Sequence, residues 1–417
     1  MRRKKPELLV PASSLEVLKT AVLYGADAVY IGGEMFGLRA KAHNFDRTDM
    51  ETGIAFAHEN GVKVYVTVNI VAHNADMKGV ETYLHELKEI RPDALIISDP
   101  GIFTLARQIA PELDVHISTQ ANNCNYGTYR FWHSLGATRV VSARELSLAE
   151  IRGIREEIPP ELEIETFVHG AMCISYSGRC LLSNYFTGRD ANHGACTHPC
   201  RWKFYVMEEQ RPGEFLPVEE NDRGTYIFNS KDLCMIEYIP ELCAAGIDSF
   251  KIEGRMKTAL YVATVARTYR RAIDDYFTSE ECYRENIAYY REEISKCTYR
   301  QYTTGFFFGK PTHETQIYDS NTYVKEYIYL GRIEEILEDN VVTLTQRNKF
   351  SLGETIEIMV PDGSNKNYRV GAIWDEEGKE MESAPHPKQK LKVRLETDSD
   401  APVSLQEGWI LRKKEEN

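Results

Sequence analysis

The segment that decides the fold reads Val62-Lys-Val-Tyr-Val-Thr-Val-Asn69, then an amphipathic stretch over Gly79–Ile90, then Ala94-Leu-Ile-Ile-Ser-Asp99. Short runs rich in Val, Ile and Leu are typical of parallel strands that are buried on both faces. Two such runs with a helix-like stretch between them predict one β-α-β unit.

The same alternation continues through the first two-thirds of the chain, with helix-like stretches such as Ser14–Tyr24 between most of the apolar runs. Eight such units predict an α/β fold, a (β/α)8 TIM-like barrel of about 250 residues. A doubly wound open sheet is the competing architecture, but no Gly-x-Gly-x-x-Gly follows the first strand. The eight expected strands are Leu8–Pro11, Ala28–Gly33, Val62–Asn69, Ala94–Asp99, Val115–Gln120, Arg139–Ala143, Ile164–Gly170 and Ser249–Gly254.

The regular spacing breaks once, between the seventh and eighth expected strands. About 78 residues, 171–248, separate them and hold six of the nine cysteines of the chain, five of which cluster between Cys173 and Cys234. Loops that follow barrel strands lie at the catalytic face, so we expect this Cys-rich insertion to cover the mouth of the barrel. A long helix is expected after the eighth strand, over Ala259–Tyr276. The predicted barrel domain is therefore residues 1–277, and a polar, tyrosine-rich connector is expected over 278–322.

The pattern changes in the last quarter of the chain, 323–417, to period-two strands separated by Gly and Asp-Gly turns. This alternation predicts a small C-terminal antiparallel β-barrel. The segment Phe350–Ile358 has the pattern of a turn followed by a strand, as in small barrels of the translation machinery, so RNA contact there is a hypothesis. The clearest strand runs are Val341–Thr345, Thr355–Met359, Lys390–Leu395 and Trp409–Arg412.

Composition limits the class of protein. The chain has 417 residues, 42% of them hydrophobic, and a net charge of −13, which argues against indiscriminate nucleic-acid binding. A local basic face is still conceivable at Arg201-Trp202-Lys203 or along Arg255–Arg271, although a solvated helix flank explains the second run equally well. No stretch approaches the roughly 18 apolar residues of a membrane span, and the N-terminus lacks a secretory apolar region. We therefore expect a cytoplasmic protein that does not bind a membrane.

Five thiols lie in the insertion with the spacing Cys173-x6-Cys180-x15-Cys196-x3-Cys200-x33-Cys234. Cytosolic thiols stay reduced, which disfavours a disulfide framework. A zinc site usually contains pairs with two to four intervening residues, and only Cys196 and Cys200 meet that rule. Scattered single thiolates suit an iron–sulfur cluster at least as well. Because a cluster needs four ligands, one of the five would be surplus.

The insertion also contains a longer motif, Glu165-x-Phe167-x-x-Gly170-Ala171-x-Cys173-x4-Gly178-x-Cys180-x-Leu182-Ser183. This motif resembles the signature of peptidase family U32, the collagenase-like peptidases. The resemblance continues through Arg189-Asp190, Cys196-x3-Cys200-Arg201-Trp202, Ser230–Cys234 and Lys251–Lys257, and it covers essentially the whole chain.

The resemblance implies two different activities. The family name implies proteolysis, whereas the better-understood members hydroxylate RNA bases or ubiquinone precursors and bind a 4Fe-4S cluster. In their pattern the ligands correspond to Cys173, Cys180, Cys196 and Cys234, with Cys200 as the alternate; zinc or empty thiols are compatible with purification in air. Members of this length and layout act on tRNA, forming 5-hydroxyuridine at the wobble position with prephenate as a required metabolite.

The residues themselves favour the hydroxylase over the peptidase. The sequence contains neither the Gly-x-Ser-x-Gly elbow that holds the nucleophile of a serine triad nor the His-Glu-x-x-His motif of a zinc protease. A Cys–His dyad is conceivable, since His169, His193 and His198 lie near the cysteines in sequence. Proteolysis is therefore the alternative function, and a non-catalytic, cluster-bearing RNA-binding protein is the second alternative.

Polar groups at the ends of the expected strands supply the candidate site, because parallel strands of a barrel end at one mouth. We expect Glu165, His169 and Glu253 to be catalytic. Cationic and amide groups are needed to hold an anionic substrate such as prephenate. The expected binding residues are Arg39, Lys41, Asn69, Gln120, Asn122, Arg144, Lys251 and Arg255.

Overall fold

The structure is a computed structural model. It describes residues 4–37, 44–172, 180, 182–189, 191, 194–199, 205–206, 216–217, 229–309, 316–317, 324–397 and 404–415. Within these residues no helix is long and apolar enough to cross a membrane.

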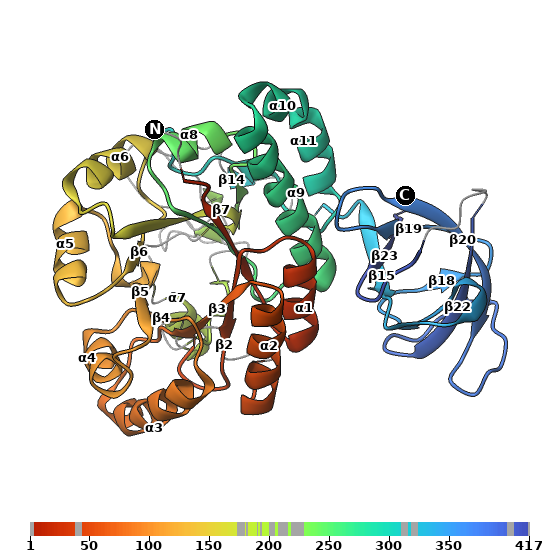
Figure 1. The fold of residues 1–417 in the computed structure, drawn as a ribbon, viewed down its shortest axis with the longest axis horizontal. Helices are drawn as coiled ribbons and strands as arrows, with labels where there is room; N and C mark the ends of the chain where they lie inside the picture. The colour runs from red at the N-terminus through yellow and green to blue at the C-terminus, as the bar shows by residue number, and fades with distance from the viewer. Residues whose placement is uncertain are drawn as a thin grey trace.

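Eight parallel strands close into a barrel, as the sequence predicts (Figure 1). Each strand pairs with the next in chain order, and β12 pairs in parallel with both β7 and β1 to complete the ring. All eight expected strands are confirmed. They are β1 (Glu7–Pro11), β2 (Ala28–Gly32), β3 (Lys63–Val68), β4 (Ala94–Ile97), β5 (Asp114–Ile117), β6 (Arg139–Val141), β7 (Glu163–Ala171) and β12 (Ser249–Ile252).

Helices surround the barrel, and their starts follow local capping chemistry. Ser14 accepts a hydrogen bond from the backbone N–H of Val17, and Ser147 forms a capping box with Glu150. The long helix α9 ends at Thr278, two residues beyond the expected boundary, and is buried along most of its length. The surrounding helices are α1 (Leu15–Leu23), α2 (Arg47–Glu59), α3 (Asn74–Ile90), α4 (Pro100–Ile109), α5 (Tyr126–Ser134), α6 (Leu148–Glu157), α8 (Ile239–Ala244) and α9 (Ala259–Thr278).

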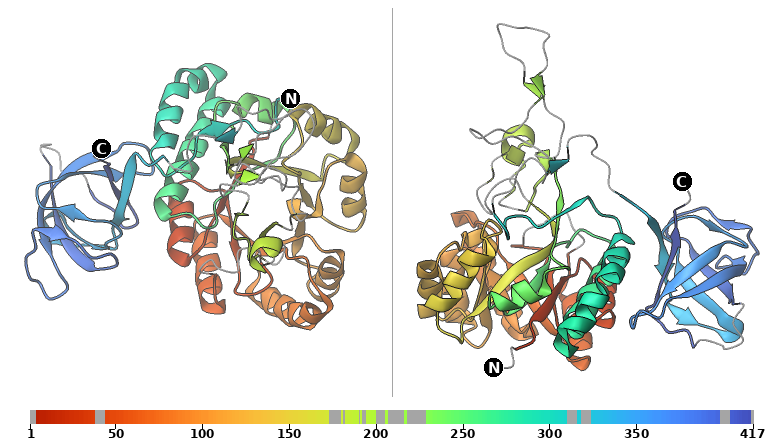
Figure 2. Two further views of the ribbon diagram at one scale, coloured as in Figure 1. Left: turned by 180° about the vertical axis from the view of Figure 1, so that it is seen from behind. Right: turned by 90° about the horizontal axis from the view of Figure 1, so that it is seen from above.

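The insertion lies at the end of the barrel where the strands finish. Figure 2 (right) shows its described elements beyond the barrel end opposite the N-terminus. Strand β7 continues past the ring, where β11 (Asp232–Cys234) pairs with it antiparallel, and β13 (Tyr302–Thr303) extends this edge. The other described elements of this region are α7 (Leu182–Thr187), β8 (Tyr205–Val206), β9 (Leu216–Pro217), β10 (Asn229–Ser230) and β14 (Gln316–Ile317).

The expected connector contains two helices, α10 (Glu280–Glu285) and α11 (Ile287–Ser295). Both pack on α9, and two of the tyrosines that suggested a polar linker, Tyr283 and Tyr290, are 1% and 0% exposed. Their rings stack on each other, so this segment is part of the packed structure.

The C-terminal part forms a seven-stranded antiparallel sheet around its own apolar core (Figure 1). The four predicted strand runs are confirmed, and β15, β16 and β20 are additional strands of this sheet. The sheet order is β15 (Tyr327–Arg332), β23 (Ile410–Lys414), β19 (Thr355–Met359), β20 (Lys366–Trp374), β22 (Lys390–Glu396), β17 (Val341–Thr345) and β16 (Glu335–Ile336). A 3-10 turn, η5 (Glu338–Asn340), and a small pair, β18 (Phe350–Ser351) with β21 (Ser383–Ala384), complete it.

Buried polar contacts join this sheet to the barrel. The Tyr24 hydroxyl donates to the Met359 carbonyl at 2.6 Å and accepts from the Ile410 backbone N–H at 3.1 Å. Glu293 of α11 lies 2.5 Å from Arg267 of α9 and 3.3 Å from Arg412 of β23. Arg267 belongs to the basic run that suggested a local cationic face, but it is buried in this ion-pair cluster. The neighbouring Arg270 pairs with Asp27 and Asp274.

Candidate active site at the mouth of the barrel

Arg255, just after β12, is buried at the mouth of the barrel. It is 4% exposed, and Nη1 donates to the hydroxyl of Thr67 on β3 at 2.8 Å. Its guanidinium lies against the backbone of Gly32, where an added Cβ would be 2.5 Å from Nη1. Asn69, after β3, donates to Ser118 after β5 at 3.2 Å. The structure therefore brings together polar groups from strands far apart in sequence.

Arg144 and Glu253 form an ion pair at the same end of the barrel. Arg144 follows β6, Glu253 follows β12, and Nη2 lies 3.2 Å from Oε2. The guanidinium also lies over the ring of Phe167, at 4.0 Å from its centroid. Both charged side chains are largely buried, at 12% and 15% exposed, so this pair forms part of the wall of the mouth.

His169 lies near the end of β7 within a group of aromatic rings. Its ring centroid is 5.5–5.9 Å from those of Tyr261, Tyr269 and Tyr302. Burial, together with the positive charge of Lys257, lowers the pKa of His169 to about 3. Its Nδ1 is buried and has no hydrogen-bond partner among the described residues. The imidazole is therefore neutral at physiological pH, a form that can accept a hydrogen bond.

Gly170, the next residue, shows why the motif needs glycine at this point. Its φ is +106°, a conformation that other residues rarely adopt. A Cβ there would lie 2.5 Å from the carbonyl oxygen of Glu253, while the Glu253 N–H donates to the His169 carbonyl at 2.8 Å. The glycine thus allows β7 and the residues after β12 to approach closely, which holds His169 and Glu253 next to each other.

Glu165 and Lys251 lie deeper in the barrel than the other predicted residues. Glu165 is 0% exposed, and its oxygens are 2.6 Å from Lys251 Nζ and 3.1 Å from Arg139 Nη1. Arg139 also pairs with Glu7 and Glu163, near the starts of β1 and β7. Because this network sits toward the end where the strands begin, it favours a structural role for Glu165 and Lys251.

Gln120 and Asn122 follow β5 on a 3-10 turn, η1 (Thr119–Ala121). The Asn122 side chain donates to the Gln120 carbonyl at 3.1 Å, and its Oδ1 is buried without a partner among the described residues. Asn122 has a φ of +57°, which asparagine tolerates better than most residues. The turn therefore leaves an amide oxygen at the mouth available to a bound group.

Two predicted substrate-binding residues and two predicted metal ligands lie outside the described residues: Arg39, Lys41, Cys173 and Cys200. Cys180, Cys196 and Cys234 are described, and all three are partly buried cysteines. The described residues contain no group of three or more His, Cys, Asp or Glu side chains close enough to hold a metal. The thiols have the chemistry of iron–sulfur ligands, but these three are not gathered into one site.

The environments of two thiols differ. The backbone N–H of His198 donates to Cys196 Sγ at 3.4 Å. The loop holding Cys196 is tied to α7, because the Thr197 N–H donates to the Ser183 hydroxyl at 3.0 Å. Burial raises the pKa of Cys234 to about 12, so its thiol is protonated without a bound cation.

Residues outside the predicted catalytic and substrate-binding set also contribute, including Glu145, which the sequence placed at a strand end without a role. The sequence assigned no role to Tyr261, Tyr269 and Tyr302, the three rings around His169. Glu145, after β6, has a pKa raised by burial, and its Oε2 has no partner among the described residues. Its position directly after Arg144 at a strand end was the only signal in the sequence.

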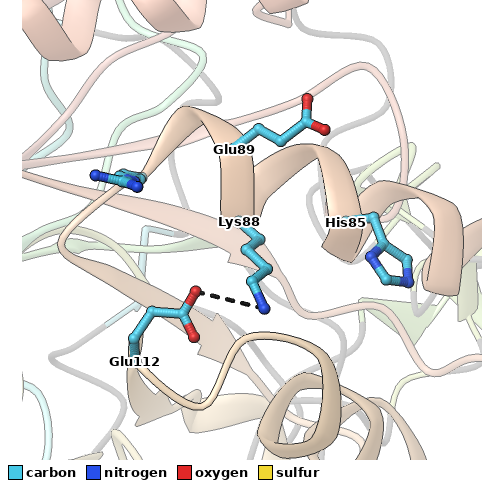
Figure 3. A pocket seen from close by; sticks show the side chains of 5 residues that line it. His85, Lys88, Glu89 and Glu112 are labelled. Atoms are coloured by element: carbon cyan, nitrogen blue, oxygen red, sulfur yellow. Dashed lines mark ion pairs between the residues drawn. The ribbon is translucent and has the colours of Figure 1, made fainter.

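Two other hollows do not belong to the mouth. One, of about 630 Å³, lies where α3 and α4 end and is lined by Lys88, Glu112 and their neighbours (Figure 3). There Lys88 is already within 3.8 Å of Glu112. The other, of about 300 Å³, opens where the strands begin and is lined by His116 and Arg139 among others. Both lie at the end of the barrel opposite the predicted site.

Comparisons with known proteins agree with this architecture. The model of peptidase family U32 matches residues 13–317, and that of the family's C-terminal domain matches 325–412. The chain is 44% identical over 397 residues to tRNA hydroxylation protein P1 of Bacillus subtilis, covering 94% of this chain and 92% of that protein. It is 38% identical to tRNA hydroxylation protein P of Escherichia coli, covering 91% and 92%. An uncharacterized protease of Methanocaldococcus jannaschii is 41% identical, covering 85% and 86%. The chain belongs to peptidase family U32.

Proposed function

We propose that this protein is a tRNA-modifying enzyme that forms 5-hydroxyuridine at the wobble position in a prephenate-dependent reaction. The observation that carries the proposal is its 38–44% identity, over more than nine-tenths of the chain, to proteins named for tRNA hydroxylation. Because the alignments cover 94% and 91% of the chain, they include both the barrel and the C-terminal sheet.

The geometry of the mouth supports the binding of a small dicarboxylate. Arg144 and Arg255 are planar donors held by Glu253, Phe167 and Thr67, and guanidinium groups bind carboxylates through paired hydrogen bonds. The neutral imidazole of His169 can accept a hydrogen bond there, and the carboxyl group of Glu145, whose pKa burial raises, can accept a proton.

The iron–sulfur cluster stays a prediction. A 4Fe-4S cluster bound by Cys173, Cys180, Cys196 and Cys234 would supply electron transfer. Because the described thiols are not gathered, we derive no reaction step through it. Because the pKa of Cys234 is raised, its thiol would have to lose a proton before the sulfur could bind a cation.

Proteolysis, the alternative, has one supporting contact among the described residues. Cys196 Sγ lies 3.9 Å from His198 Nδ1, which is long even for a hydrogen bond to sulfur. The second alternative, a non-catalytic RNA-binding protein, does not explain why buried, unpartnered polar atoms surround the mouth.

The test is to map the modification. Transfer RNA from cells lacking the gene is compared with tRNA from the same cells carrying it on a plasmid, after ribonuclease digestion and mass spectrometry of anticodon fragments. The proposal predicts that the plasmid adds the mass of one oxygen atom to the wobble uridine. An added oxygen at another nucleotide would contradict the position, and no added oxygen would contradict the activity.

A further inference from the structure

Strand β22 presents a row of cations on the outer face of the C-terminal sheet. Its sequence, Lys390-Leu-Lys-Val-Arg-Leu-Glu396, alternates between the core and solvent. Leu391, Val393 and Leu395 are at most 2% exposed, whereas Lys390, Lys392 and Arg394 are exposed. Residues two apart on a strand are about 6.6 Å apart, so the three cations form an evenly spaced line.

A β-bulge places an aromatic ring beside this line. In β20, Tyr368 and Val370 face the core, and strict alternation would turn Trp374 inward as well. The register shifts between Val370 and Ala372, so Ile373 faces the core and Trp374 pairs with Lys392 on the outer face. Gly371 permits the shift, because a side chain there would collide with the carboxylate of Glu396.

The ring is held in place by its neighbours. The Arg394 guanidinium lies 5.4 Å from the centroid of the Trp374 ring, a cation–π contact that orients both groups. On the other side of β22, β17 pairs Thr343 with Lys392 and Thr345 with Lys390. Their partly exposed side chains add hydroxyl donors to the same face.

The charges on this face are not neutralised within the described part of the chain. Lys392 and Arg394 have no ion pair there, and Lys390 has a carboxylate, Glu376, no nearer than 3.9 Å, with both side chains about two-thirds exposed. Such a pair contributes little in solvent. Three carboxylates border the face: Glu396 beside Arg369, Glu335 beside Thr343, and Glu380, which is paired with Trp374. In a chain of net charge −13, this is a concentration of available positive charge.

We propose that this face, formed by Lys390, Lys392, Arg394 and Trp374, binds the sugar–phosphate backbone of the tRNA substrate. The inference rests on the proposed function. Evenly spaced cations match the repeating charge of a nucleic-acid strand, and a partly exposed indole such as that of Trp374 can stack on a base. Figure 1 shows β22 on the side of the C-terminal sheet farther from the barrel, so the contact would lie on a part of the tRNA away from the modified uridine.

The test compares the triple variant Lys390→Gln/Lys392→Gln/Arg394→Gln with the wild-type chain in binding to full-length tRNA at several salt concentrations. A plot of log affinity against log salt concentration has a negative slope, and each lost phosphate contact makes it shallower by about 0.7–0.9. The slope of the variant should therefore be shallower by about 2–3, and the variant should bind tRNA at least about tenfold more weakly at low salt. The matched control is Lys78→Gln/Lys88→Gln/Arg152→Gln, which removes the same charge from α3 and α6 and should bind as the wild type does.

Two further readouts separate this inference from the proposed function. Trp374→Ala should weaken tRNA binding while leaving the salt slope unchanged, because stacking releases no counterions. If tRNA is hydroxylated but the triple variant keeps the wild-type affinity and salt slope, the face does not bind tRNA, although the proposed function is supported. If the slope falls as predicted but no hydroxyuridine forms, the face stands and the function is wrong. An equal loss in the control variant would overturn the face, since net charge alone would then explain it.

Discussion

Lys251 Nζ lies 2.6 Å from a carboxylate oxygen of Glu165 inside the barrel, with Arg139 3.1 Å from the other oxygen. The carboxylate is 0% exposed, and the three side chains come from β12, β7 and β6. Lys251 also lies over the ring of Tyr30 on β2, 4.6 Å from its centroid. A carboxylate that binds two buried cations joins neighbouring strands, which gives Glu165 a role in stability.

The first prediction follows from this pair. Glu165→Gln should lower the free energy of unfolding by about 3–5 kcal/mol, because it leaves two buried cations short of a carboxylate. Urea denaturation measures the loss. The control is Glu157→Gln on α6, whose partner Arg130 is equally exposed and which should cost at most about 1 kcal/mol. A Glu165→Gln protein of normal stability that no longer hydroxylates tRNA would instead assign Glu165 a chemical role.

The barrel could be predicted because each strand is a short apolar run whose identity depends only on local sequence. The contacts of Glu165 could not, because Arg139 joins it to Glu7, which lies 132 residues from Arg139 in sequence. A charged residue within a predicted strand suggested that Glu165 belongs to the active site. In the closed barrel it instead lies in a buried network of ion pairs with Lys251 and Arg139. Local sequence does not show which charged residues, distant in sequence, form ion pairs in the folded protein.

The sequence predicted which residues lie at the mouth of the barrel, but not which of them form ion pairs with each other. Arg144 and Glu253 each follow an apolar run, so strand ends placed both at one face, although 109 residues separate them. The basic run along α9 looked solvent-exposed by spacing, yet Arg267 is buried because Glu293 of α11 and the carbonyl of Val360, just after β19, are its partners. The cations of β22 could be recognised by alternation, but the bulge that brings Trp374 beside them depends on tertiary pairing.

The second prediction concerns anion binding at the mouth. Arg255→Lys keeps the charge but loses the planar pair of donors, so hydroxylation should fall about 10- to 150-fold, which corresponds to about 1.5–3 kcal/mol. Arg144→Lys should reduce it in the same direction. Melting temperature and tRNA hydroxyuridine are measured together, with Arg152→Lys as the exposed control. Wild-type hydroxylation by both variants would place the anion site elsewhere.

The third prediction concerns acid stability. Burial, together with the charges of Arg139, Lys251 and Lys63, lowers the pKa of His116 well below its usual value near 6.5. The unfolded chain therefore binds a proton that the folded chain does not. Stability should be fully present above pH 6.5 and fall as the pH drops below it, by up to about 1.4 kcal/mol per pH unit for this residue.

His169, whose pKa is also lowered, adds a similar slope. Urea titrations between pH 4.5 and 7 should therefore show a smaller slope in His116→Gln than in the wild-type chain. The exposed histidine variant His85→Gln should keep the full slope. An undiminished slope in His116→Gln would show that this imidazole is not buried in its neutral form.

The fourth prediction concerns the cysteines. In protein purified without oxygen, alanine at Cys173, Cys180, Cys196 or Cys234 should remove iron and acid-labile sulfide, while Cys200→Ala should retain both. Cys243→Ala, at a buried thiol of α8, controls for damage to the fold. Retention of iron in Cys234→Ala with loss in Cys200→Ala would exchange the two assignments. Zinc without sulfide in the wild-type protein would replace the cluster with a zinc site.

The most direct measurement is the 5-hydroxyuridine content of total tRNA from cells that lack every family member and carry this chain, a variant or an empty plasmid. The account predicts that the wild-type chain restores the nucleoside and that Arg255→Lys, produced at the same level, restores far less. Loss of the nucleoside when prephenate synthesis is also blocked would support the predicted co-substrate. Cells carrying the wild-type chain with no more 5-hydroxyuridine than the empty-plasmid cells would contradict the central claim.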